Sequence, residues 1–114
     1  MTPIEQDLRQ VFHHYPTERL LALLQAFEQD RVIRQQYADA SGRRCLLGHL
    51  DPSITSKEKL QEAFPTEQSY PAPRDVVRAW DDGRLTEAMV LRQLLRILAE
   101  RRGPAARAAP LPRS

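Results

Sequence analysis

Apolar residues recur at intervals of three and four along most of the chain, which is the period of an amphipathic helix. Near the start, Ile4, Leu8, Val11 and Phe12 share one helical face. A threonine, a proline and a glutamate at the beginning of this stretch form the pattern of a capping box. The sequence therefore predicts a first helix over 3–14.

A second, leucine-rich stripe begins at Leu20 and continues to Phe27. Polar residues around Asp30 interrupt it, and it resumes at Val32 in a position rotated around the helix axis. We predict one helix over 17–39 with two packing faces. A bend near Asp30 is the alternative, although no proline or glycine there forces one.

The rest of the chain divides into shorter segments. Gly42 is suited to the turn after a helix end. The pattern then predicts one or two helical turns over 43–50, helices over 56–64, 73–83 and 86–102, and an extended proline-rich connector over 65–73. No alternating pattern predicts a strand. We expect an all-α fold, a single small domain of five to six helices in an orthogonal or irregular bundle.

The end of the chain differs in composition from the body. We expect Gly103 and Pro104 to stop the last helix, so that the helical domain covers 1–102 and a flexible basic Ala/Pro tail covers 103–114. Residues 101–114 hold four of the 17 basic groups and no acid, which leaves 13 basic against 15 acidic groups in the body. A slightly acidic body disfavours a broad nucleic-acid surface.

Length and composition indicate the number of domains and the cellular compartment. The chain of 114 residues fits one domain. Its single cysteine cannot form an internal disulfide, and no apolar run approaches the roughly 20 residues that cross a bilayer. With no signal-peptide pattern at the start, we expect a cytoplasmic protein without membrane contact. The frequent Arg, Ala, Leu and Gln residues suggest a bacterial source.

The segment 41–50 is the best candidate for chemistry because it holds Cys45 and His49. Because the two residues are four positions apart, their side chains would lie on the same side of a helix. A helix N-terminus and the neighbouring arginines would lower the pKa of the Cys45 thiol, and His49 would act as its base. A thiol or redox protein is therefore a third alternative, but the pattern favours a structural hinge in which Gly42 ends the preceding helix and Cys45 lies in the core. The ligand count argues against a metal site, since only His13 and His14 could be added. We expect no cofactor and, with no catalytic motif, no enzyme activity.

Two groups of arginines are candidates for binding. The first group gathers before and within the segment 41–50, and the second lies on one face of the last predicted helix. Such groups can neutralise phosphates, which makes a nucleic-acid-binding regulator an alternative function. The candidate interaction residues are Arg31, Arg34, Arg43, Arg44, Arg92 and Arg96.

The wide leucine stripe of 86–102 favours a different function. A small helical domain with so apolar a last helix is typical of proteins that bind another protein or a second copy of themselves. We therefore expect a non-enzymatic adaptor or regulator that acts by protein–protein interaction and forms a homo-oligomer, with the nucleic-acid and Cys45 thiol functions as alternatives.

Overall fold

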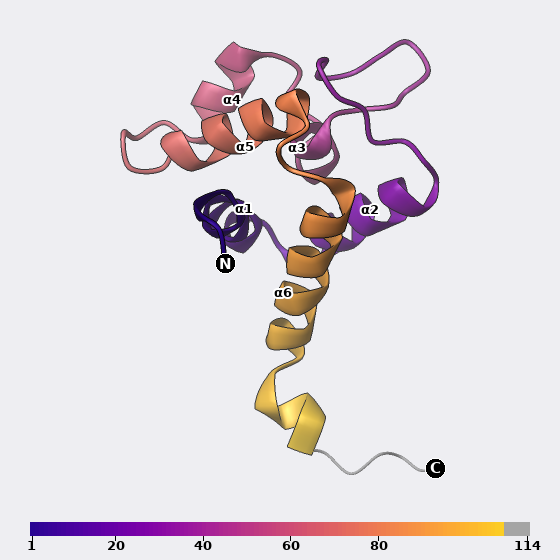
Figure 1. Cartoon of the computed structure of the whole chain (residues 1–114), viewed down its shortest axis with the longest axis vertical. Helices are drawn as coiled ribbons and strands as arrows, with labels where there is room; N and C mark the ends of the chain where they lie inside the picture. The colour runs from indigo at the N-terminus through magenta and orange to yellow at the C-terminus, as the bar shows by residue number, and fades with distance from the viewer. Residues whose placement is uncertain (109–114) are drawn as a thin grey trace.

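The computed structural model describes residues 1–108, with side chains up to Arg102. Within this range every regular element is a helix (Figure 1), and no β-strand forms, which confirms the all-α prediction. The helices are α1 (Pro3–His14), α2 (Thr17–Glu28), α3 (Leu46–Leu50), α4 (Lys57–Ala63), α5 (Pro71–Asp82) and α6 (Glu87–Ala108).

Helix α1 has the bounds that the sequence predicted. The Thr2 hydroxyl accepts a hydrogen bond from the Glu5 amide at 3.2 Å, and the Glu5 carboxylate accepts one from the Thr2 amide at 3.2 Å. This reciprocal capping box satisfies amide groups that have no partner within the helix. The helix ends at His14 because Pro16 disfavours helical backbone at Tyr15, the residue before it.

The prediction of one helix over 17–39 is wrong, because α2 ends at Glu28. Asp30 takes a left-handed backbone conformation with φ 56°. The Asp30 amide then donates to the Phe27 carbonyl at 3.1 Å, and the Arg31 amide donates to the Ala26 carbonyl at 2.9 Å. These two bonds form a Schellman motif, which satisfies the last carbonyls of the helix without the usual glycine.

The ends of the last two helices also differ from the prediction. Helix α5 begins at Pro71 rather than Pro73, since both prolines lie in its first turn, where backbone N–H groups have no intrahelical partner. Helix α6 extends to Ala108, past Gly103 and Pro104, so the predicted end at 102 is wrong. The remainder of the predicted tail, 109–114, lies outside the described residues.

The core centres on the contacts of α1 with α5 and α6. Helix α1 packs against both α5 and α6, α2 packs against α6 and the short α3, and α3 also contacts α5. Figure 1 shows α5 lying across the upper end of α6, with α1 seen nearly end-on beside them. The arrangement is an irregular bundle. Its fully buried side chains include Leu8, Phe12, Leu20, Leu23, Leu46, Leu47, Leu50, Ile54, Leu60, Leu85, Leu94 and Ile97.

A buried carboxylate joins α1 to α6. Glu5 is only 5% exposed, and its Oε2 accepts a hydrogen bond from the Gln93 side chain at 2.9 Å and one from Arg92 at 3.2 Å. The bonds from Gln93 and Thr2, together with the Arg92 charge, lower the Glu5 pKa from 4.5 to about 2. The ionised form of Glu5 therefore stabilises the contact between the two helices.

This pKa shift predicts how stability depends on acid. Because the folded-state pKa of Glu5 lies below its unfolded value, the contribution is complete above about pH 4.5 and is lost as the pH falls toward 2. Urea unfolding across this range should show a shallower loss of stability in Glu5→Gln than in the wild type. The exposed Glu67→Gln is the matched control and should follow the wild type. Equal slopes for all three proteins would contradict the role of Glu5.

Candidate functional site

The segment 29–45 is an ordered loop between α2 and α3, and we call it the arginine loop. Its two limbs are joined by backbone hydrogen bonds: the Ile33 amide donates to the Arg44 carbonyl at 2.9 Å, and the Arg44 amide donates to the Arg31 carbonyl at 3.1 Å. Isolated β-bridges connect Arg44 with Val32 and with Ala38. The first limb of the loop thus supplies backbone hydrogen-bond partners to the extended backbone at Arg44.

Trp80 near the end of α5 holds this loop against the domain. Its indole Nε1 donates to the Ile33 carbonyl at 2.8 Å. The Arg34 guanidinium lies 3.6 Å from the centroid of the indole ring and donates to the carbonyls of Trp80 and Leu85. The Asp81 carboxylate accepts a hydrogen bond from the Gln35 backbone amide at 2.7 Å. The loop is thus attached to the C-terminal end of α5, where helix carbonyls need donors.

The other arginines of the loop also bond within the fold. Arg31 donates to the Ser41 carbonyl at 3.1 Å, and Arg44 donates to the Pro52 carbonyl at 2.9 Å. Arg43 is more exposed and forms an ion pair with Asp39 at 2.8 Å. All four arginines that the sequence grouped together as a phosphate-binding surface therefore have partners inside the protein. This arrangement weakens the nucleic-acid alternative.

The second predicted arginine group, on α6, consists of Arg92 and Arg96, which differ in their contacts. Arg92 is half-exposed and forms an ion pair with the buried Glu5 at 3.2 Å. Arg96 is exposed, and the described part of the chain gives it neither an ion pair nor a hydrogen bond. A single cation of this kind is not a phosphate-binding surface.

Cys45 and His49 do not form the predicted catalytic pair. Cys45 is the N-cap of α3, 3% exposed, and its Sγ accepts a hydrogen bond from the Gly48 amide at 3.4 Å. The predicted lowering of its pKa is wrong, because burial raises the pKa of this thiol. The His49 Nε2 instead donates to the Arg31 carbonyl at 2.8 Å, and burial lowers the His49 pKa.

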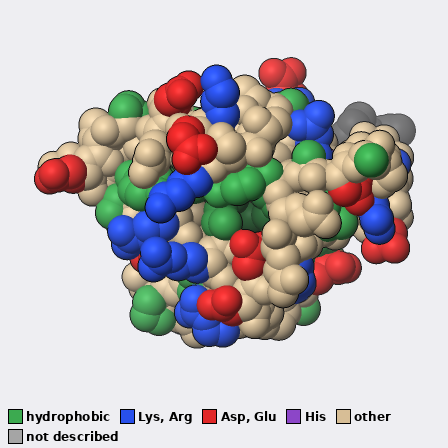
Figure 2. All heavy atoms as spheres, turned by 90° about the horizontal axis from the view of Figure 1, so that it is seen from above, with side chains coloured by type: hydrophobic (Ala, Val, Ile, Leu, Met, Phe, Trp, Pro, Cys, Tyr) green, Lys and Arg blue, Asp and Glu red, His purple; other side chains and the backbone are tan. Residues whose placement is uncertain are grey.

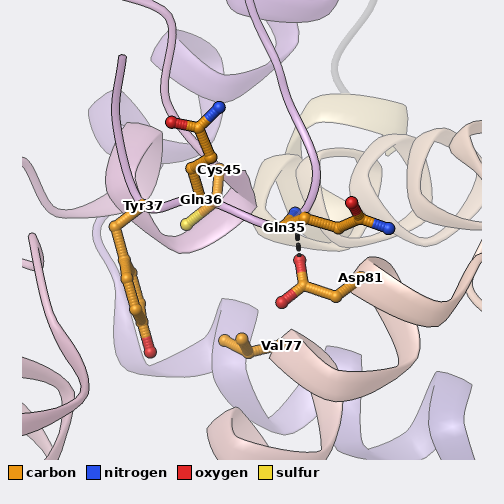
Figure 3. A pocket seen from close by; sticks show the side chains of 6 residues that line it. All are labelled: Gln35, Gln36, Tyr37, Cys45, Val77 and Asp81. Atoms are coloured by element: carbon orange, nitrogen blue, oxygen red, sulfur yellow. Dashed lines mark hydrogen bonds between the residues drawn. The ribbon is translucent and has the colours of Figure 1, made fainter.

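The space beside Cys45 is too small for a substrate. Figure 3 shows the Cys45 side chain next to a pocket whose walls include Tyr37, Val77 and Asp81, with the Gln35–Asp81 hydrogen bond at its edge. The pocket volume is about 40 Å³, which holds little more than water. Among the described residues, no three His, Cys, Asp or Glu side chains lie close enough together to hold a metal ion.

Sequence reasoning missed Arg19 as a structural residue. From α2, its Nε donates to the Leu50 carbonyl at 2.9 Å, and its Nη2 donates to the His49 carbonyl at 2.7 Å. These bonds satisfy the last carbonyls of the short helix α3 and fix it to α2. No local sequence signal could have revealed this role, because donor and acceptors lie some thirty positions apart.

Helix α6 carries two apolar stripes, of which only one is fully covered. Val90, Leu94 and Ile97 are completely buried in the core. Leu91, Leu95 and Leu98 form a second stripe at spacings of four and three, which we call the outer seam. Leu95 is 53% exposed, while Leu91 and Leu98 are partly buried against the core. The outer seam therefore exposes one leucine, Leu95, between two that are partly buried.

Comparison with known protein families, with curated proteins and with solved structures finds no match to this chain. The described helices also include none with the length and apolar character needed to cross a membrane. The function must therefore be inferred from the contacts and surfaces of the chain itself.

The burial of Cys45 predicts its chemistry. A thiol-specific disulfide reagent should label the native protein only at the rate of unfolding, because a buried thiol with a raised pKa presents little thiolate. In urea the same reagent should react at once. The signal is unambiguous, since the chain has one cysteine. Complete labelling of the native protein on mixing would instead support the thiol function.

Proposed function

We propose that this protein acts by protein–protein interaction, as a non-enzymatic adaptor or regulator, and that it self-associates through the outer seam of α6. The observation that carries this proposal is the exposure of Leu95 between Leu91 and Leu98. Apolar residues at spacings of four and three are the pattern by which two helices pack side by side. A leucine left half-exposed within such a stripe gains free energy when a second helix covers it.

The charges at the ends of the seam favour a second copy of the same helix as the partner. Glu87 lies one turn before Leu91 and Arg102 lies one turn after Leu98, and both are exposed. In an antiparallel pair centred on Leu95, a two-fold axis brings Glu87 of each copy close to Arg102 of the other. The same surface then serves both copies, as in most homodimers.

The placement of the candidate residues supports binding rather than catalysis. Cys45, His49 and the arginines of the loop are engaged in bonds that build the fold, so they are not free to act on a substrate. The outer seam is narrow compared with the interfaces of obligate dimers, which bury about 2,000 Å² or more. We therefore expect a reversible dimer with a dissociation constant in the micromolar range.

Substitution of Leu95 tests the proposal. In sedimentation equilibrium, the wild type should change from monomer to dimer as concentration rises, whereas Leu95→Glu should remain a monomer because two carboxylates would face each other in the seam. Leu21→Glu is the matched control, since Leu21 is 49% exposed on α2 and lies outside the seam. A wild type that stays monomeric at all concentrations, or a Leu95→Glu protein that dimerises equally well, would overturn self-association.

The antiparallel register is tested by exchanging charges. Glu87→Arg or Arg102→Glu alone should weaken the dimer about threefold to thirtyfold, because the two-fold axis places each change in two exposed ion pairs, and the double exchange should restore it. Failure of the double exchange to restore dimerisation, with both single variants weakened, would exclude this register.

A further inference from the structure

A hollow lies between α4, α5 and the arginine loop, on the end of the molecule opposite the free end of α6. Figure 2, which views this end of the molecule, shows exposed hydrophobic side chains beside a group of Lys and Arg side chains, with Asp and Glu side chains also nearby. The volume of the hollow is about 180 Å³. It is lined by Tyr37, Lys57, Leu60, Tyr70, Arg74, Val77 and Arg78. We call it the basic hollow.

The floor of the basic hollow is apolar. Leu60 is 2% exposed, and Tyr37, Tyr70 and Val77 are each half-buried around it. Aromatic side chains of this kind supply a large contact area at a small entropy cost. The floor is therefore suited to an apolar side chain from outside the protein.

The rim of the basic hollow is positive. Its three charged lining residues are all cations. Arg74 is partly neutralised by Asp75 at 3.1 Å. Lys57 and Arg78 are exposed, and neither forms an ion pair within the described residues. Two cations without an ion pair thus flank an apolar floor, while the carboxylates of Glu58 and Asp81 lie near enough to Tyr37 to raise its pKa.

We infer that the basic hollow binds an acidic peptide segment of a partner protein, with one large apolar side chain in the hollow and neighbouring carboxylates on Lys57 and Arg78. Charge complementarity selects this occupant. The hollow is smaller than the roughly 300–1,000 Å³ of small-molecule sites, which fits one anchoring side chain better than a whole ligand.

Two other occupants fit less well. A nucleic-acid strand needs a longer series of phosphate contacts than Lys57 and Arg78 provide. The tail of this chain has the wrong sign, since residues 103–114 contain two arginines and no acid. The inference is also independent of the outer seam, because none of the residues that line the hollow lies on α6.

Fluorescence anisotropy with peptide pools tests this inference on the full-length chain. The probes are short fluorescein-labelled peptides with a central Leu, Phe or Trp flanked by Asp and Glu, and matched pools flanked by Lys and Arg. Acidic pools should bind saturably and basic pools should not. Lys57→Glu and Arg78→Glu should each weaken binding about fivefold to tenfold, because each replaces an attraction by a repulsion.

The control variant is Arg96→Glu, which makes the same charge change at an exposed residue outside the hollow and should bind like the wild type. Circular dichroism establishes that each variant is folded. The inference is overturned if every acidic pool binds more weakly than about 1 mM, or if the hollow variants and Arg96→Glu behave alike. Tighter binding of labelled oligouridylate than of any acidic pool would also overturn it, in favour of nucleic acid.

Discussion

The attachment of the arginine loop to Trp80 is the interaction that places the loop, Cys45 and one wall of the basic hollow. A loop of this length brings many backbone polar groups against the core, and each buried group left without a partner costs about 1–3 kcal/mol. The indole Nε1 of Trp80 donates a hydrogen bond to the Ile33 carbonyl. The Arg34 guanidinium lies over the indole ring and also donates to carbonyls at the end of α5. With the loop fixed there, Tyr37 becomes a wall of the basic hollow and Cys45 becomes buried.

Among the described residues, most arginines of the loop bind backbone carbonyls of the fold. Guanidinium groups offer several donors in a fixed geometry, which suits them to bind the carbonyls of irregular backbone. Four arginines bind backbone carbonyls in this way: Arg19, Arg31, Arg34 and Arg44. Arg43 forms an ion pair with Asp39 instead. The two surfaces that we propose for partners, the outer seam and the basic hollow, lie on different helices. A dimer formed through α6 would therefore carry two hollows.

The sequence predicted those parts of the structure that depend on local pattern. The capping box at Thr2 and the core stripe of α6 are both set by residues within one or two helical turns, and both were found. The end of α2 was missed because Asp30 adopts a conformation that a glycine usually supplies. The structural role of Arg34 was missed because it depends on Trp80, 46 positions away. Arginines that are close in sequence do not indicate which backbone carbonyls will lie near them in the folded protein.

Hydrogen exchange in the arginine loop tests the central claim, that arginine and tryptophan side chains hold this segment in one conformation. In the wild type, the amides of Ile33, Arg44 and Cys45 should be protected nearly as well as those of the core helices, because each donates a backbone hydrogen bond. In Arg34→Ala the protection of these three amides should fall while α1 stays protected. Fast exchange of these amides in the wild type, or no change in the variant, would contradict the account.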